Sequence, residues 1–177
     1  DVTSNTSVQA GSSVSDQNAV SPQYSAIVAS SPSKASLGSS EPDSKYMFEV
    51  EFSSRGASIS RVTLSRFKDR FDKAKQLDLL LPLRTGSGGE LLSITTGSLA
   101  MLDQKVVLPL EQLDWFASEP VTDADGTQSI TFNASAKRAD TGEAIRITKT
   151  YVIRPGEYHI DCDIKLTNLT GQAYKTR

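Results

Sequence analysis

The sole histidine of the sequence is the first candidate for chemistry. His159 lies in a stretch where polar and apolar residues alternate, and Asp161 and Asp163 follow it at intervals of two. Because strand residues two apart share a face, the three side chains would form one polar row that could bind a metal or act in acid–base catalysis. Such a row is more often a solvated strand face, and the sequence has no second histidine to complete a zinc site. We therefore predict no catalytic residue and no metal ligand.

Two short motifs begin like known sites but lack the parts that those sites need. Gly86-Ser87-Gly88-Gly89 lacks the following lysine of a phosphate-binding loop, which favours a plain loop. Asp123-Ala124-Asp125-Gly126 begins like a calcium loop, but the downstream carboxylate ligands are missing, which favours a turn. Serine is abundant, yet no Gly-x-Ser-x-Gly elbow occurs. We therefore expect no cofactor and no enzymatic activity.

The charge and the cysteine content of the chain narrow the classes of partner. The net charge is −2 and lysines and arginines do not cluster, so nothing in the composition attracts a phosphate backbone. Nucleic acid is therefore not an expected partner. The single cysteine, Cys162, cannot form an internal disulfide, and its place in an apolar row predicts a small buried side chain.

The candidate residues near His159 belong to a predicted β-hairpin. Ala144 to Ile153 and Tyr158 to Leu166 alternate strictly, and Arg154-Pro155-Gly156-Glu157 suits a tight turn between them. In the second run one face of the strand is apolar, and a second layer of the domain is expected to cover it. The residues of that face are Tyr158, Ile160, Cys162, Ile164 and Leu166.

The first quarter of the chain differs in composition from the rest. Residues 1–45 are dominated by serine with few large apolar residues, which predicts a disordered linker. The run Ala26 to Ala29 could form a transient strand, but its serine-rich flanks favour a structureless tether. The expected folded domain spans residues 46–177.

The rest of the domain has the pattern of short antiparallel strands. Phe48, Val50 and Phe52 alternate with acidic residues, and after a turn at Gly56 a second strand begins. Residues 67–75 fit either a short helix or a polar excursion, and residues 77–83 fit a buried strand end or a sheet edge. Further short apolar runs follow at intervals of about ten residues with turn signals between them, which predicts an all-β antiparallel β-sandwich.

Two stretches together resemble a known family. Phe48 to Leu64 resembles the first strands of the periplasmic domain of bacterial YidC-type membrane protein insertases. Ile147 to Asn168 is similar to that domain's hairpin, in which a Lys-Thr-aromatic strand meets a Gly-acid-Tyr turn and a strand that closes on asparagine. The order of the two motifs and the polar segment ahead of them also fit, so the resemblance covers roughly residues 46–177.

The resemblance implies a fold, a location and partners. The fold would be a β-supersandwich similar to galactose mutarotase, tethered by the serine-rich linker to a transmembrane helix and facing the periplasm at the bacterial inner membrane. The domain would be an accessory element of a multi-pass insertase, with the Sec translocon and membrane-protein clients as partners. In the family the domain continues with further strands, so exposed sheet edges are expected if this chain is truncated at Arg177. No particular partner-binding residues are implied.

The alternative is a carbohydrate-binding or mutarotase-like β-sandwich. Mutarotase-like enzymes rely on paired histidines with an acid, whereas this sequence has only one histidine, which argues against catalysis. Sugar binding stays open because Trp115, Phe116, Tyr151 or Tyr158 could form a stacking platform. Aromatic residues of a sandwich are nevertheless more often buried in its core. A spacer domain without any ligand is a further alternative.

Overall fold

The computed structural model describes residues 24–86 and 88–177, and nearly all of its regular structure is antiparallel β-sheet. One sheet has six strands, which we call sheet A, and a second sheet has four, which we call sheet B. Sheet A contains β1 (Tyr24–Ile27), β10 (Phe116–Ala117), β11 (Val121–Thr122), β12 (Gln128–Arg138), β13 (Gly142–Ile153) and β14 (Asp161–Asn168). Sheet B contains β2 (Lys34–Gly38), β3 (Phe48–Ser53), β4 (Ser58–Lys68) and β5 (Gln76–Leu80).

Two small hairpins and two short helices complete the described chain. The hairpins are β6 (Leu83–Arg84) with β7 (Glu90–Leu91), and β8 (Leu99–Met101) with β9 (Val106–Leu108). The helices are the 3-10 turns η1 (Leu102–Gln104) and η2 (Leu110–Gln112). Within residues 24–86 and 88–177, no helix has the length and hydrophobicity needed to span a membrane.

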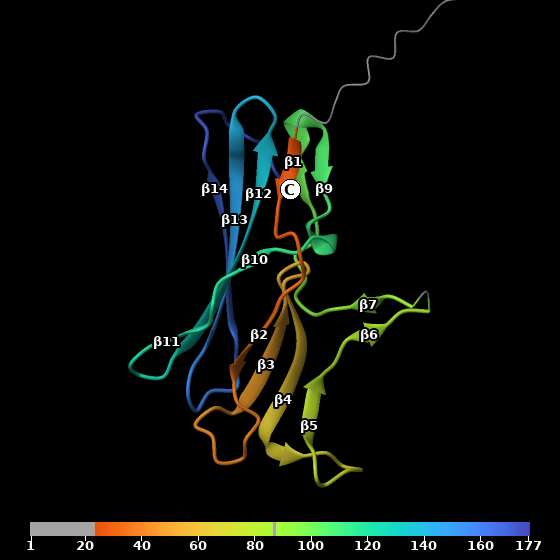
Figure 1. The fold of residues 1–177 in the computed structure, drawn as a ribbon, viewed down its shortest axis with the longest axis vertical. Coiled ribbons are helices and arrows are strands. Elements are labelled where there is room, and N and C mark those ends of the chain that lie inside the picture. Colours follow the sequence, from red (N-terminus) through yellow and green to blue (C-terminus); the bar gives the residue numbers. More distant parts are fainter. Residues whose placement is uncertain (1–23, 87) are drawn as a thin grey trace, which may run out of the picture.

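The two sheets pack against each other as a sandwich, which confirms the predicted all-β antiparallel fold. Figure 1 shows the long strands of sheet A running the height of the molecule, with sheet B against their lower half. Phe52 of sheet B lies 4.7 Å from Tyr151 and 6.0 Å from Phe132 of sheet A, measured between ring centroids. All three side chains are buried, so this aromatic cluster joins the layers.

The predicted C-terminal hairpin is present, but its second strand is shorter than expected. β13 pairs with β14 in a register that places Tyr151 opposite Cys162 and Ile147 opposite Leu166. β14 begins at Asp161 and β13 ends at Ile153, so the two strands are connected by a loop of residues 154–160. This loop is longer than the tight turn predicted at residues 154–157.

The prediction that the apolar face of β14 is buried is wrong. Ile164 and Leu166 each keep 49% of their surface exposed, and Cys162 is exposed as well. β14 is the last strand of sheet A, and nothing in the described residues covers this part of it. Alternation shows which side chains share a face, but whether an opposing layer reaches that face depends on the tertiary structure.

The linker interpretation is wrong for residues 24–38, which form strands of both sheets. β1 pairs with β12 and β2 pairs with β3, and Tyr24 and Leu37 on these strands are almost fully buried. The backbone N–H of Gly38 also donates to Oε1 of Gln128 at 2.6 Å. Serine-rich strands are stabilised here by main-chain pairing with an existing sheet edge, which composition does not reveal. Residues 1–23 of the predicted linker lie outside the described residues.

The helix alternative for residues 67–75 is also wrong. β4 continues to Lys68, and a turn follows in which Asp69 accepts hydrogen bonds from the backbone N–H groups of Phe71 and Asp72 at 2.7 and 2.8 Å. These bonds lower the pKa of the Asp69 carboxyl. Phe71 is 90% exposed, so this segment is the polar excursion that was the other interpretation.

Candidate functional site

The sandwich has an apolar groove on one side. The groove lies between the strands of sheet B and the loop of residues 154–160 that precedes β14. It has a volume of about 600 Å³. β3, β4 and β5 contribute most of its walls, and the remainder comes from Ile94 and the loop before β14. The residues that line this apolar groove are Phe48, Ile59, Val62, Leu64, Phe67, Leu79, Leu80, Ile94, Tyr158 and Ile160.

The groove has a buried floor and an exposed rim. Phe48 and Ile59 on the floor are 4% and 2% exposed, whereas Leu79 and Tyr158 on the rim are 64% and 55% exposed. Phe67 meets Tyr158 edge to face across the rim, with 6.5 Å between ring centroids. Continuous apolar surface of this kind on the outside of a domain is typical of a binding site for another apolar surface.

A buried lysine holds one wall of the groove in place. Ile94 has a φ of 53°, a left-handed conformation that β-branched residues rarely adopt. The Nζ of Lys149 on β13 donates to the Ile94 carbonyl and, at 3.1 Å, to the Thr96 hydroxyl. Lys149 is almost completely inaccessible, and burial lowers the pKa of its ammonium group. The lysine therefore acts as a structural tether between sheet A and the loop that carries Ile94.

Two members of the predicted polar row, His159 and Asp161, lie in an exposed cluster of polar side chains with Arg154 and Glu157, and Asp163 makes no ion pair among the described residues. Nε2 of His159 lies 3.1 Å from Oε2 of Glu157 and 3.8 Å from Oδ1 of Asp161. Arg154 pairs with the other oxygen of Asp161 at 2.5 Å, and this hydrogen bond lowers the pKa of the Asp161 carboxyl. In residues 24–86 and 88–177, no three His, Cys, Asp or Glu side chains converge as metal ligands would.

A comparison with family models decides what this domain is. The model of the YidC periplasmic domain matches residues 45–177, about three quarters of the chain. The chain belongs to the YidC periplasmic domain family. Searches of curated proteins and of solved structures found no significant match.

Membership in the YidC periplasmic domain family confirms the resemblance of the two sequence motifs. Domains of this family are parts of membrane protein insertases, and the family is not a known catalytic one. It implies a domain that faces the periplasm from an inner-membrane protein.

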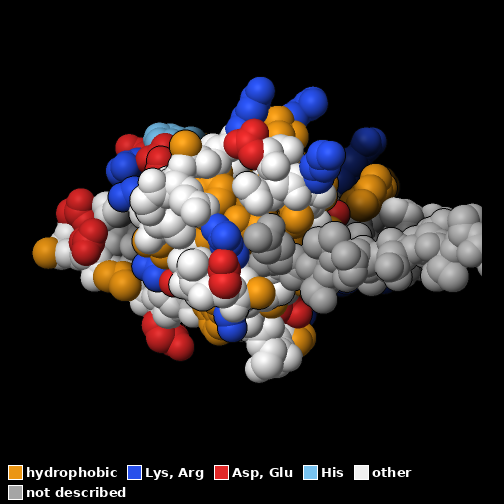
Figure 2. All heavy atoms as spheres, turned by 90° about the horizontal axis from the view of Figure 1, so that it is seen from above, with side chains coloured by type: hydrophobic (Ala, Val, Ile, Leu, Met, Phe, Trp, Pro, Cys, Tyr) orange, Lys and Arg blue, Asp and Glu red, His pale blue; other side chains and the backbone are white. Residues whose placement is uncertain are grey.

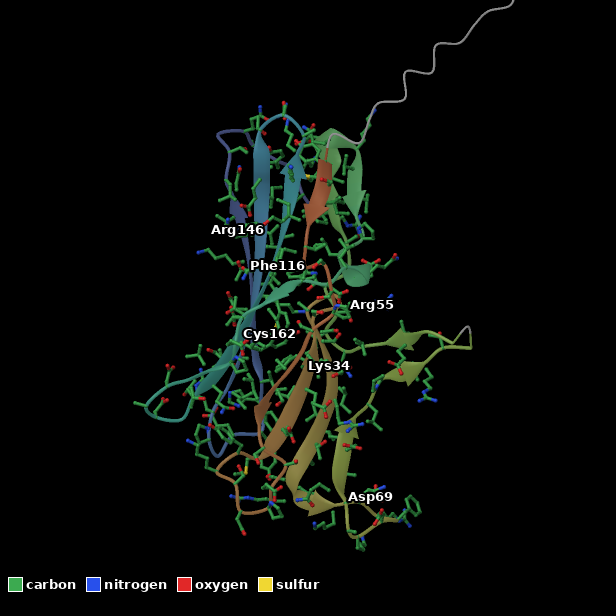
Figure 3. The ribbon with its side chains drawn as sticks, in the orientation of Figure 1. Lys34, Arg55, Asp69, Phe116, Arg146 and Cys162 are labelled. Atoms are coloured by element: carbon green, nitrogen blue, oxygen red, sulfur yellow. The ribbon has the colours of Figure 1, made fainter. Side chains whose placement is uncertain are left out.

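The aromatic residues proposed for sugar stacking do not form one platform in this YidC periplasmic domain. Trp115 and Tyr151 are fully buried, and their polar atoms donate to the carbonyls of Leu110 and Ala57 at 3.2 and 2.8 Å. Phe116, labelled in Figure 3, projects from β10 and is 47% exposed. Only Tyr158 lines the apolar groove. The structure therefore gives no support to the carbohydrate alternative.

The other motifs have the structures that the sequence favours. Asp125 accepts hydrogen bonds from the backbone N–H and the hydroxyl of Thr127 at 2.8 and 3.0 Å, as expected for a turn. Where β6 connects to β7, the N–H of Thr85 donates to the Gly89 carbonyl at 2.8 Å. On the face shown in Figure 2, Lys and Arg side chains lie next to Asp and Glu, with hydrophobic side chains between them. That face offers no continuous basic surface for nucleic acid.

Sequence patterns missed the groove because its residues come from separate segments. The apolar run of residues 77–83 was the main signal, and its interpretation as a sheet edge agrees with the position of β5 at the end of sheet B. The exposure of Leu79 and the approach of Tyr158 to Phe67 depend on how the sheets pack.

Glu143 provides a test of pH-dependent stability in this domain. Its carboxylate accepts hydrogen bonds from Arg146 at 2.9 and 2.7 Å and from the Ser135 hydroxyl, and these bonds lower its pKa below the usual 4.5. The folded state therefore binds fewer protons than the unfolded state, so the stabilisation is present above pH 4.5 and is lost as pH falls through the lowered pKa.

We expect Glu143→Gln to lower the free energy of unfolding by about 1 kcal/mol at neutral pH and by much less in acid. Urea unfolding of the parent and the variant across a pH series measures this. A difference that does not change with pH would show that the ion pair contributes nothing beyond packing.

Proposed function

We propose that this domain is an accessory, non-catalytic part of a multi-pass inner-membrane insertase and acts through protein–protein contacts in the periplasm. The apolar groove is the observation that supports this role most directly. Its proposed occupants are apolar segments of membrane-protein clients or of Sec translocon subunits, which family membership makes the expected neighbours.

The chemistry of the groove fits such an occupant. Nine of its ten lining residues have purely hydrocarbon side chains, and Tyr158 adds one hydroxyl. Burial of apolar surface contributes about 25 cal/mol per Å² before the entropy cost of association is subtracted, so a few large side chains in a groove of this size are expected to bind weakly and transiently. A client segment that awaits insertion would present such side chains.

Photo-crosslinking from the groove in the full-length parent insertase tests the proposal. A photoreactive residue at Tyr158 is expected to crosslink clients or translocon subunits, and Leu79→Glu should reduce the yield severalfold because it places a charge on the rim. Leu83→Glu is the matched control, because Leu83 is 66% exposed and lies outside the groove, whereas Leu79 is 64% exposed.

Both substituted positions are on the surface, so the fold should survive in both variants. Equal crosslinking in the two variants, or none from Tyr158 in the parent, would refute binding in the groove.

A further inference from the structure

The connection between β4 and β5 carries a local excess of positive charge. Residues 66–75, which we call the basic turn, comprise the last three residues of β4 and the turn that follows. They contain five lysines and arginines against two aspartates, so their net charge is +3, whereas the whole chain carries −2. The prediction that cationic residues do not cluster is therefore wrong for this segment. Its five exposed cationic residues are Arg66, Lys68, Arg70, Lys73 and Lys75.

The two aspartates of the basic turn are occupied within it. The carboxylate of Asp69 accepts hydrogen bonds from two backbone N–H groups of the turn, at 2.7 and 2.8 Å. That of Asp72 pairs with Lys75 at 3.4 Å. Most of the remaining positive charge is therefore available to an external anion. The cationic residues that form no ion pair with any described residue include Arg66, Lys68 and Arg70.

An aromatic side chain projects from the same turn. Phe71 is 90% exposed, and the guanidinium of Arg70 lies over its ring, 5.7 Å from the centroid. The N–H of Asp69 donates to the carbonyl of Lys75, and the N–H of Lys75 donates to that of Asp72, each at 3.0 Å. The turn is therefore closed by its own hydrogen bonds, and it presents an apolar ring among cationic side chains.

The basic turn lies at one end of the sandwich. Figure 1 shows the connection between β4 and β5 at the lower end of the molecule, and Figure 3 labels Asp69 there. The described C-terminal end is in the upper half, where Arg177 pairs with Ala100 of β8. The exposure of the turn follows from its position at the tip of sheet B, and β14 takes no part in it.

We propose that the basic turn binds the surface of an anionic lipid bilayer. Its lysine and arginine side chains lie among the lipid phosphates, and Phe71 inserts to the boundary of the acyl chains. Basic segments are attracted to anionic lipids, and a neighbouring apolar side chain adds burial at that boundary. A domain that faces the periplasm from an inner-membrane protein has such a surface beside it.

A nucleic acid fits the basic turn less well than a bilayer does. Bases stack on the open face of an aromatic ring along a basic groove. Phe71 is instead a single ring at the tip of a turn, and Arg70 lies over its face. A projecting ring of this kind is suited to insertion between lipid headgroups.

Phe67 joins the basic turn to the apolar groove. It lies between Arg66 and Lys68 at the end of β4, lines the groove, and meets Tyr158 across the rim. A domain held to the bilayer by the basic turn would therefore keep the groove next to the membrane surface. Lipid binding goes beyond the proposed function and does not depend on what occupies the groove.

Co-sedimentation of the whole 177-residue chain with lipid vesicles tests the proposal. The parent should partition onto vesicles that contain phosphatidylglycerol at least about tenfold more strongly than onto phosphatidylcholine vesicles, and added salt should weaken the binding. Arg66→Glu combined with Arg70→Glu should lower the partition coefficient about tenfold. Lys34→Glu combined with Lys105→Glu is the matched control, because it changes the net charge equally at exposed positions outside the basic turn.

The control pair should change the partition coefficient less than about twofold, because its charges lie away from the contact. All four positions are exposed, so the fold should survive in both variants. Equal binding to the two kinds of vesicle, or equal losses in the two double variants, would overturn the proposal. So would retention on single-stranded DNA that matches the binding to anionic vesicles, since the turn would then recognise phosphate polymers.

Tryptophan fluorescence tests the insertion of residue 71. The native Trp115 is fully buried, so its emission should not respond to vesicles. In Phe71→Trp, anionic vesicles should shift the emission to shorter wavelength, and lipids with brominated acyl chains should quench it. Phe116→Trp is the control, because Phe116 is 47% exposed and lies on β10, and its emission should not change. Unchanged emission from Phe71→Trp, or equal quenching in both variants, would overturn the insertion of Phe71.

Discussion

Phe52→Ala should lower the free energy of unfolding by about 3–5 kcal/mol, the usual cost of removing a fully buried aromatic side chain. Phe52 is completely buried and contacts Tyr151 and Phe132 of the opposite sheet, with ring centroids 4.7 and 6.0 Å away. Alanine would leave a cavity between the layers and remove one of the aromatic contacts that join them. Urea or thermal unfolding followed by circular dichroism measures the change.

The same substitution at an exposed phenylalanine is the control for Phe52. Phe71 is 90% exposed in the turn after β4, so Phe71→Ala should change the free energy of unfolding by less than about 0.5 kcal/mol. If both variants lose similar stability, Phe52 does not join the sheets in the way the structure shows.

Gly38→Ala should lower the free energy of unfolding by about 2–5 kcal/mol, through backbone strain and a steric clash. Gly38 has a φ of +82°, and a Cβ there would lie 2.1 Å from the Phe48 carbonyl oxygen. An L-residue in this conformation costs about 1–2 kcal/mol, and overpacking against a fixed backbone atom costs about 1–3 kcal/mol more. Denaturant unfolding of the purified variant measures the loss.

A second glycine separates the clash from the strain. Gly88 also has a φ of +82°, but a Cβ there would meet no atom within 4 Å. Gly88→Ala should therefore cost only about 1–2 kcal/mol, from the strain alone. Equal effects at the two positions would mean that β2 does not pack against β3 and that residues 24–38 are not part of the folded unit.

The outcome of the Gly38→Ala experiment would also indicate at which residue the folded domain begins. The family match starts at residue 45, yet β1 and β2 precede it and contribute Tyr24 and Leu37 to the core. Both strands lie in the segment whose composition predicts a linker. We propose that the folding unit extends from residue 24, with the match covering its later part.

Local sequence determined the strands whose patterns are strong. Phe48, Val50 and Phe52 are buried as their alternation predicts, and β12, β13 and β14 follow the predicted order. The turn at Asp125 also follows from local chemistry, because its carboxylate bonds within the turn. These features depend on side-chain periodicity and on contacts within a few residues, which a sequence contains in full. Two of these segments, Phe48 to Leu64 and Ile147 to Asn168, also carried the resemblance to the family that the match over residues 45–177 confirms.

Only the tertiary structure determined which strand faces pack against another layer. The alternation of β14 is as clear as that of β3, but its apolar row remains half-exposed because no layer of the described chain covers it. Conversely, the weak serine-rich segments became β1 and β2 because sheet edges were available to pair with them. The apolar groove likewise needs Tyr158 beside Phe67, residues that are far apart in the chain. Burial depends on what packs opposite a face, and that information is non-local.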